Sequence, residues 1–151
     1  MKTHSIAEIL SAHEFFSDMK PEHIEFISGC AKVSHFASGK FMILAGEPAD
    51  NFYLIRSGYT AVEIEIGNQV RTIHSPGPGE FVGWSWILPP ARWRYDVRVV
   101  EDVSAISFDA ECVRKKCEAD FEFGYHIYRR ILKIVIERLM ATRIQMIDMY
   151  A

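Results

Sequence analysis

The stretch from Pro76 to Val99 reads PGPGEFVGWSWILPPARWRYDVRV and holds all three tryptophans of the chain, three of its nine glycines and four of its six prolines. Glycine permits positive φ and close backbone approach. Tryptophan offers a flat face to a base, a ring or a cation, and arginine binds phosphate or carboxylate through paired hydrogen bonds. Gly83 is predicted to start a short helical turn, whose free N–H groups would suit an anion. A purely structural interpretation is also open, in which the tryptophans fill a core and the arginines are solvated.

The composition around this stretch is that of a soluble globular protein. The chain has 151 residues, 49% of them hydrophobic and 25% charged, which predicts a single domain with a core of its own. Its net charge of −3 and pI near 6.1 argue against a dedicated nucleic-acid binder. The N-terminus lacks the pattern of a signal peptide, and no apolar run approaches the roughly 18 residues of a membrane span.

Catalytic and metal chemistry are not expected from the residue pattern. The cysteines Cys30, Cys112 and Cys117 are odd in number and show no disulfide-like pattern, so a reducing cytoplasm is the predicted location. The six histidines show no metal-ligand spacing. No nucleophile–base pair and no convincing carboxylate dyad stands out, so an enzyme is not predicted.

Helical periodicity opens the chain and period-two alternation follows it. An amphipathic helix is predicted over Ser5–Ser17, and a second helix begins at Pro21 and closes at Gly29. Short strands then alternate with turns up to Phe108, which indicates a sandwich or a jelly roll. The predicted turns are Gly46-Glu47-Pro48, Ser57-Gly58, Gly67-Asn68 and Glu101-Asp102.

The pattern becomes helical again near the C-terminus. Asp109 is predicted to cap a short helix through Cys117, and Asp120 a long helix running towards Met149. The long helix carries a heptad seam of Tyr128, Leu132, Val135, Leu139, Thr142, Met146 and Met149, and a second apolar row that includes Ile127, Ile131 and Ile134. Two apolar faces predict a homodimer through this helix; the alternative is a helix that buries both faces within its own chain.

The order of these elements resembles that of the cyclic-nucleotide-binding domain of Crp/Fnr-like sensors. The motifs that carry the resemblance are Phe15-Phe16 with Met19; Gly39, Ile43 and Gly46; Phe52-Tyr53-Leu54-Ile55 with Ser57-Gly58; Gly77, Gly79 and Phe81-Val82-Gly83; Asp96-Val97-Arg98-Val99; and Ile106-Ser107-Phe108-Asp109. The resemblance implies an α+β, mainly β fold, an eight-stranded β jelly roll (double-stranded β-helix) with N-terminal helices and a long C-terminal helix. It implies one domain over 1–151, with helices in 1–29, the roll in 30–108 and helices in 109–151.

The phosphate-binding cassette departs from the pattern of the family. The glutamate that binds the ribose in cAMP-binding members corresponds to Trp84, and the arginine that binds the phosphate corresponds to Trp93. Arg94 is the first choice for a substitute arginine through a shift in register. The candidate ligand-binding residues are Gly83, Trp84, Ser85, Trp86, Arg92, Trp93, Arg94 and Tyr95.

The resemblance implies a stand-alone regulatory sensor that binds a small ligand in the roll and signals through its C-terminal helix to an unidentified protein partner. The ligand would be a cyclic nucleotide or another small anionic or aromatic molecule; no other cofactor is expected, and the altered cassette argues against cAMP and cGMP. The alternative is a ligand-free interaction and dimerisation module with a tryptophan-filled pocket. No helix-turn-helix follows the long helix in this sequence, so DNA binding is not predicted. Membrane binding is not predicted either, because no apolar run is long enough to span a bilayer.

Overall fold

The structure is a computed structural model that describes residues 4–150. Its contacts group the chain into two compact units, one up to Val113 and the other from Arg114. Residues 1–3 and 151 of the predicted single domain lie outside the described residues.

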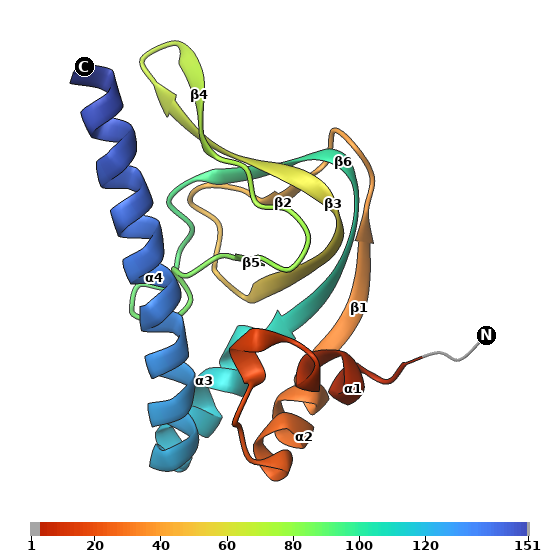
Figure 1. The fold of residues 1–151 in the computed structure, drawn as a ribbon. Helices are drawn as coiled ribbons and strands as arrows, with labels where there is room; N and C mark the ends of the chain where they lie inside the picture. Colours follow the sequence, from red (N-terminus) through yellow and green to blue (C-terminus); the bar gives the residue numbers. More distant parts are fainter. Residues whose placement is uncertain (1–3, 151) are drawn as a thin grey trace. The chain divides into compact units, whose positions relative to one another are not determined.

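Three short helical segments precede the sheet: α1 Ile6–Ser11, the 3-10 helix η1 Glu14–Phe16, and α2 Pro21–Gly29 (Figure 1). The predicted bounds of α2 are confirmed. The first helix is shorter than predicted because His13 begins a new turn: its Nδ1 accepts a hydrogen bond from the Phe15 N–H at 3.0 Å.

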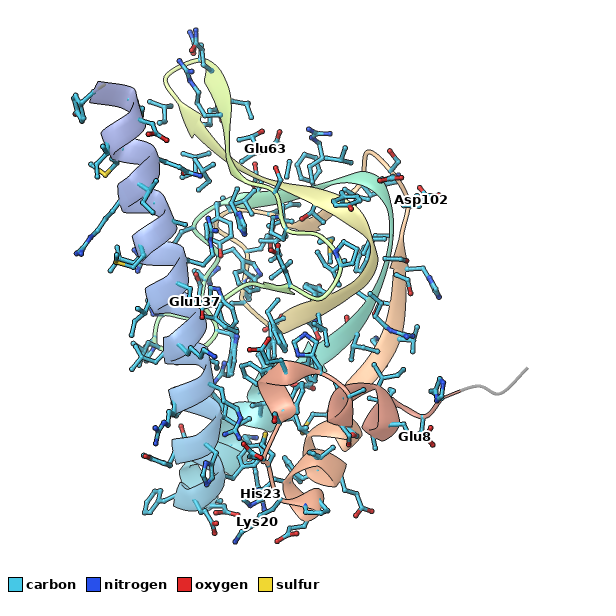
Figure 2. The ribbon with its side chains drawn as sticks, in the orientation of Figure 1. Glu8, Lys20, His23, Glu63, Asp102 and Glu137 are labelled. Carbon is cyan, nitrogen blue, oxygen red and sulfur yellow. A yellow bond between two sulfur atoms is a disulfide. The ribbon has the colours of Figure 1, made fainter. Side chains whose placement is uncertain are left out.

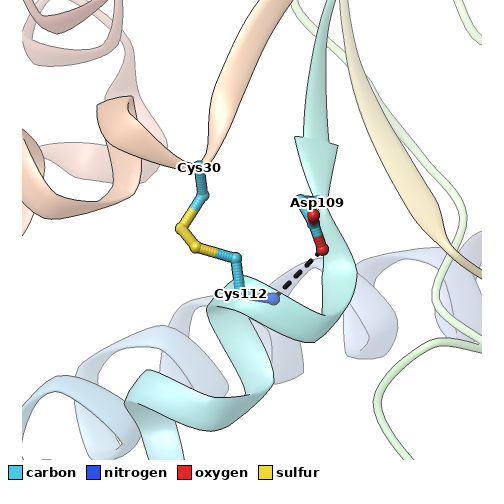
Figure 3. Close-up of a disulfide and its surroundings, with 3 residues drawn as sticks. All are labelled: Cys30, Asp109 and Cys112. Carbon is cyan, nitrogen blue, oxygen red and sulfur yellow. Dashed lines mark hydrogen bonds between the residues drawn. A yellow bond between two sulfur atoms is a disulfide. The ribbon is translucent and has the colours of Figure 1, made fainter.

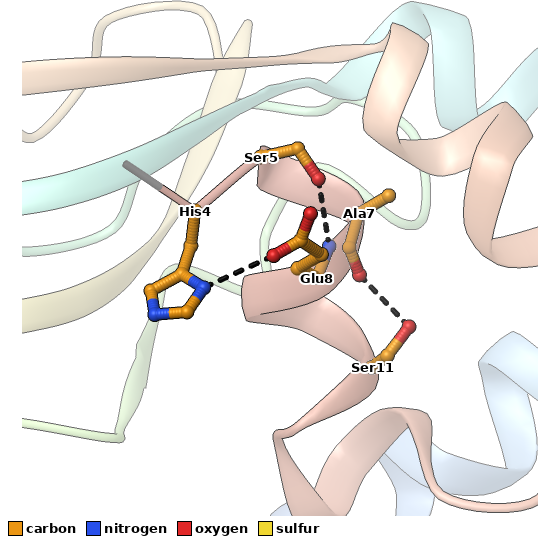
Figure 4. Close-up of polar contacts among 5 residues, drawn as sticks. All are labelled: His4, Ser5, Ala7, Glu8 and Ser11. Carbon is orange, nitrogen blue, oxygen red and sulfur yellow. Dashed lines mark hydrogen bonds and ion pairs between the residues drawn. The ribbon is translucent and has the colours of Figure 1, made fainter. Parts of the chain in front are cut away.

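The start of α1 agrees with its prediction. The Ser5 hydroxyl accepts from the Glu8 N–H at 3.2 Å, which satisfies one of the free amides of the first turn. His4 Nδ1 lies 3.0 Å from the Glu8 carboxylate in the same turn (Figure 4), and this hydrogen bond lowers the pKa of Glu8.

One antiparallel sheet follows, in which the order of the main strands is β1-β6-β3-β4, with β2 paired to β6 and β5 paired to β3. The strands are β1 Ala31–Phe36, β2 Phe41–Ile43, β3 Asn51–Ile66, β4 Gln69–His74, β5 Phe81–Val82 and β6 Asp96–Asp109. The two long strands β3 and β6 curve as they cross the sheet (Figure 1).

The described residues contain six strands, whereas the sequence predicted eight. Strands β3 and β6 run through two of the predicted turns, Ser57-Gly58 and Glu101-Asp102, and their pairing shifts register there. A residue inserted into a ladder in this way bends a strand without ending it. Gly58, at φ +89°, is pressed against the backbone of Asp102 (labelled in Figure 2), so a Cβ has no room at this position. The mixed α and β class with an antiparallel sheet is confirmed, and the strand count is not.

Two helices end the chain, α3 Ala110–Ala119 and α4 Phe121–Tyr150. Both predicted caps are confirmed: Asp109 accepts from the Cys112 N–H at 3.1 Å, and Asp120 from the Phe123 N–H at 3.2 Å. The boundary between the two units falls inside α3.

The two apolar rows of α4 differ in exposure. Ile127 and Ile131 of the second row are 1% and 5% exposed. The heptad seam is open instead, with Leu132, Leu139 and Met146 about half exposed. The charged residue Glu137 of the same helix is labelled in Figure 2. The second row is therefore buried at Ile127 and Ile131 and half-buried at Ile134, whereas the heptad seam is exposed.

The expectation of three unpaired cysteines is wrong. Cys30 and Cys112 form a disulfide, and the third cysteine, Cys117, is free and buried (Figure 3). The pairing of β1 with β6 brings residue 31 opposite residue 108, which places the residues that flank the two strands side by side. The bond removes the cysteine argument for a reducing compartment, so a cytoplasmic location stays a prediction.

Across residues 4–150, none of the helices combines the length and apolar character of a membrane span. The same residues contain no group of three His, Cys, Asp or Glu side chains that could hold a metal ion.

Candidate functional site

The cassette loop, residues 83–95, joins β5 to β6 and holds all eight candidate ligand-binding residues. At its start Gly83 has φ +97° and is buried. A Cβ on Gly83 would lie 2.5 and 2.8 Å from two ring carbons of Trp93, so the indole rests directly on the glycine backbone. Trp93 is 6% exposed, and the Ile43 side chain borders the same spot. The position at which a cAMP-binding member would place its arginine is thus packed with an aromatic ring.

The backbone of Trp93 is fixed from the turn that follows β2. Its N–H donates to the Glu47 carbonyl at 3.0 Å, and its carbonyl accepts from the Gly46 N–H at 2.8 Å. The sequence predicted a turn at Gly46-Glu47-Pro48, but it did not indicate that this turn is hydrogen-bonded to the cassette loop. Two backbone hydrogen bonds give the indole a defined place against Gly83.

Trp86 belongs to the core of the first unit. Its ring stacks on Phe52 with centroids 4.3 Å apart and planes 7° apart, and Phe52 stacks on Phe108 at 4.7 Å and 9°. Trp86 is fully buried, and its indole N–H donates to the Gly83 carbonyl at 3.1 Å. The Trp86 ring extends an aromatic column and anchors the start of the loop, which is the arrangement that the structural interpretation expects.

The remaining candidates of the loop, Trp84, Ser85 and Tyr95, are half-buried. Burial raises the pKa of the Tyr95 phenol, and an interaction with the Trp84 backbone partly offsets the rise. The expected helical turn is reduced to one hydrogen bond, from the Ile87 N–H to the Trp84 carbonyl at 3.3 Å.

Two of the three arginines of the stretch form hydrogen bonds with other parts of the chain. Arg92 is exposed and donates to the Gly46 carbonyl at 2.9 Å. Arg98 bonds both carboxylate oxygens of Glu63, at 3.1 and 3.2 Å (Glu63 is labelled in Figure 2). Arg94 is exposed and makes no hydrogen bond or ion pair with another residue of the range 4–150. Its whole guanidinium is available to an incoming group.

The Asp96 carboxylate, whose negative charge would repel a phosphate, is hydrogen-bonded to the backbone. Its carboxylate accepts from the Ala45 N–H at 2.8 Å and so supports the turn that also holds Trp93.

A hollow of about 230 Å³ opens beside Trp93, and Trp93 is the single candidate ligand residue that lines it. Its other walls come from β2 and from the start of β3, and its charged groups are Glu47 and Asp50. Two carboxylates disfavour an anion such as a cyclic phosphate. The hollow is not a substitute for the nucleotide pocket.

The fold and the cassette position together define the class of protein. The model of the cyclic nucleotide-binding domain family matches residues 33–120, more than half of the chain. The chain belongs to this family of regulatory binding modules.

Particular relatives agree with this assignment. A CRP-like cAMP-activated global transcriptional regulator of Mycobacterium tuberculosis is 24% identical over 147 residues, which cover 94% of this chain and 62% of that protein. The chain thus spans less than two thirds of the length of this curated relative. A Geobacter metallireducens structure described as a cyclic nucleotide-binding protein superposes with a TM-score of 0.81 at 21% identity, covering 91% of this chain and 99% of that one. A cyclic nucleotide-binding domain from Methylobacillus flagellatus superposes with a TM-score of 0.80 at 16% identity, covering 95% and 82%.

Proposed function

We propose that this chain is a regulatory interaction module of the cyclic nucleotide-binding type whose cassette is closed by its own side chains. The observation that carries the proposal is the Trp93 indole lying on Gly83. Closure by the protein itself would keep the module in one state without a ligand.

Two requirements of a cyclic nucleotide go unmet in this arrangement. A phosphate needs a guanidinium and free backbone N–H groups. The aligned position carries Trp93, whose indole is packed on Gly83 and supplies no guanidinium. A ribose needs an acceptor such as the family's glutamate, and the aligned residue is Trp84. A nucleotide would therefore have to displace packed aromatic side chains before making any favourable contact.

The second part of the proposal is that α4 pairs with a second copy of the chain. The seam residues Leu132, Val135 and Leu139 are 56%, 38% and 48% exposed. Apolar residues at heptad spacing favour pairing of two helices, since pairing removes them from water. The dimer would be the working unit, and its surface would be read by a protein partner.

The test combines ligand titration with mass measurement. We expect the fluorescence of the three tryptophans to stay flat when cAMP or cGMP is added, and light scattering to give the mass of a dimer. Leu139→Glu places a charge on the seam and is expected to give monomers, whereas Gln145→Glu, off the seam, keeps the dimer. A saturable fluorescence change would refute the closed cassette. A wild-type mass of 17.4 kDa, that of one chain, would refute the pairing.

A second candidate is a sensor for a different small anion, favoured by the exposed guanidinium of Arg94. In that case a metabolite screen would produce a saturable tryptophan signal, and Arg94→Ala would abolish it while Arg92→Ala would not. Loss of the signal in Arg92→Ala alone would contradict this assignment.

A further inference from the structure

The disulfide joins the end of α2 to the first turn of α3. Cys30 follows α2 as its C-cap, and Cys112 is in the first turn of α3. The two residues are 82 positions apart in sequence, with their Cα atoms 5.8 Å apart (Figure 3). The bond therefore fastens the first turn of α3 to the N-terminal part of the chain, just before the unit boundary that follows Val113.

Both cysteines face a hollow open to solvent. The hollow has a volume of about 290 Å³, and its lining includes Cys30, Cys112, Lys32, Asn51 and Asp109. Cys30 is 7% exposed and Cys112 is half-buried, so an incoming thiol reaches Cys112 more readily. A disulfide in the wall of such a hollow is accessible to small reagents without unfolding of the core.

Charged groups surround Cys112. It lies at the N-terminal end of α3, a helix of ten residues, and the cationic Lys32 lines the same hollow. The Asp109 carboxylate accepts a hydrogen bond from the Cys112 N–H at 3.1 Å.

Cys117 provides an internal contrast. It is 4% exposed, and burial raises the pKa of its thiol to about 11, against an ordinary value of 9.0. A buried thiol that stays protonated neither attacks a disulfide nor is modified readily. Exchange at Cys30 and Cys112 therefore has no competing thiol in the described chain.

The local structure keeps other ties when the sulfur–sulfur bond is absent. The Asp109 N–H donates to the Cys30 carbonyl at 2.8 Å, and the Ala110 N–H donates to the Asp50 carbonyl at 2.9 Å. Ala110 and Val113 are fully buried. Reduction would thus loosen the first turn of α3 without releasing the strand that leads into it.

We propose that Cys30 and Cys112 are a reversible dithiol–disulfide couple that sets how firmly α3 is held. A small thiolate of the glutathione or dithiothreitol class attacks Sγ of Cys112; the Cys30–Cys112 bond breaks, and Cys30 leaves as a thiolate that takes up a proton. A second thiol then attacks the mixed disulfide, which releases the Cys112 thiol and a small-molecule disulfide. Two electrons pass from the two small thiols to the protein disulfide. In the reverse reaction the protein dithiol gives two electrons to the small disulfide, and the Cys30–Cys112 bond re-forms.

The test equilibrates the folded protein in glutathione buffers of graded redox poise, traps thiols with a maleimide tag and counts the tags by mass spectrometry. We expect two tags in reduced folded protein and none in oxidised folded protein, with Cys117 tagged only after denaturation. Amide hydrogen exchange is then compared between the two forms. Beyond the acceleration that all amides share through the lower global stability, those of Cys112 and Val113 should exchange on the order of tenfold faster after reduction than those of β3.

Matched variants make the assignment specific. The double variant Cys30→Ser with Cys112→Ser should exchange like the reduced protein in every buffer, and Cys117→Ser should respond like the wild type. The proposal is overturned if the bond is reduced only in denaturant, because the disulfide is then a permanent staple. It is also overturned if reduction accelerates exchange at the start of α3 no more than in β3, because a lower global stability alone would then account for the change.

Discussion

Replacing Trp93 by alanine measures how completely the cassette is closed. A buried tryptophan removes about 200 Å² from water, and at about 25 cal/mol/Å² this is worth roughly 5 kcal/mol. The alanine methyl and partial collapse of the loop recover some of it, so we expect a loss of about 4 kcal/mol in the free energy of unfolding. For a chain of 151 residues this corresponds to a fall in Tm of about 12 °C.

Urea unfolding followed by far-ultraviolet circular dichroism measures this loss, with the slope m checked for constancy. The control is Trp84→Ala, whose side chain is only half-buried, and for which we expect less than half of the effect. Added indole should raise the midpoint of Trp93→Ala and leave the wild type unchanged, because an apolar cavity of this kind binds small aromatic molecules.

A loss below about 1 kcal/mol with unchanged m would refute the reasoning, since that is the cost of changing an exposed side chain. The indole would then not be packed on Gly83 in solution, and the cassette would be open to a ligand. If the full expected loss of unfolding free energy is measured but indole does not rescue it, the packing of Trp93 on Gly83 would still be supported. The loop would then have filled the cavity left by the indole in the variant.

Four further outcomes are expected. The double variant Cys30→Ser with Cys112→Ser should unfold with about 4 kcal/mol less free energy than the oxidised wild type, because an 82-residue loop is no longer closed in the unfolded chain; denaturant titration measures this. The Cys117 thiol should react slowly with iodoacetamide at pH 8 and faster as the pH approaches 11. Its raised pKa also contributes stability that is complete below pH 9.0, the ordinary thiol value, and is lost as the pH rises to about 11, which unfolding titrations at graded pH would detect. A double-mutant cycle on Glu63 and Arg98 should give a coupling of about 1 kcal/mol or less, because the arginine side chain is 38% exposed.

Local signals in the sequence predicted local structure well. Pro21 marks the start of α2 because its missing N–H costs nothing in the first turn. Asp109 and Asp120 mark the starts of α3 and α4 because a carboxylate accepts the free amides there. Each of these features depends on residues within one helical turn, so each can be recognised without the tertiary structure.

Features that join distant segments were not predictable in this way. The Cys30–Cys112 bond depends on β1 pairing with β6, which the spacing of cysteines does not reveal. Gly58 was interpreted as a turn, although it lies within β3 and meets the backbone of β6. The sequence aligned Trp93 with the family's ligand-binding arginine, but it did not show whether the indole would fill the site. That depends on the contact of the ring with Gly83, which lies ten residues earlier in the chain.

The contact between Trp93 and Gly83 also bears on how this cassette can evolve. Tryptophan has one codon, UGG, and one base change converts it to CGG or AGG, both of which encode arginine. The residue that closes the site is therefore a single mutation away from the residue that the family uses to hold a phosphate. That mutation would remove a buried ring and introduce a buried cation in one step, so stabilising changes elsewhere in the domain would have to come first.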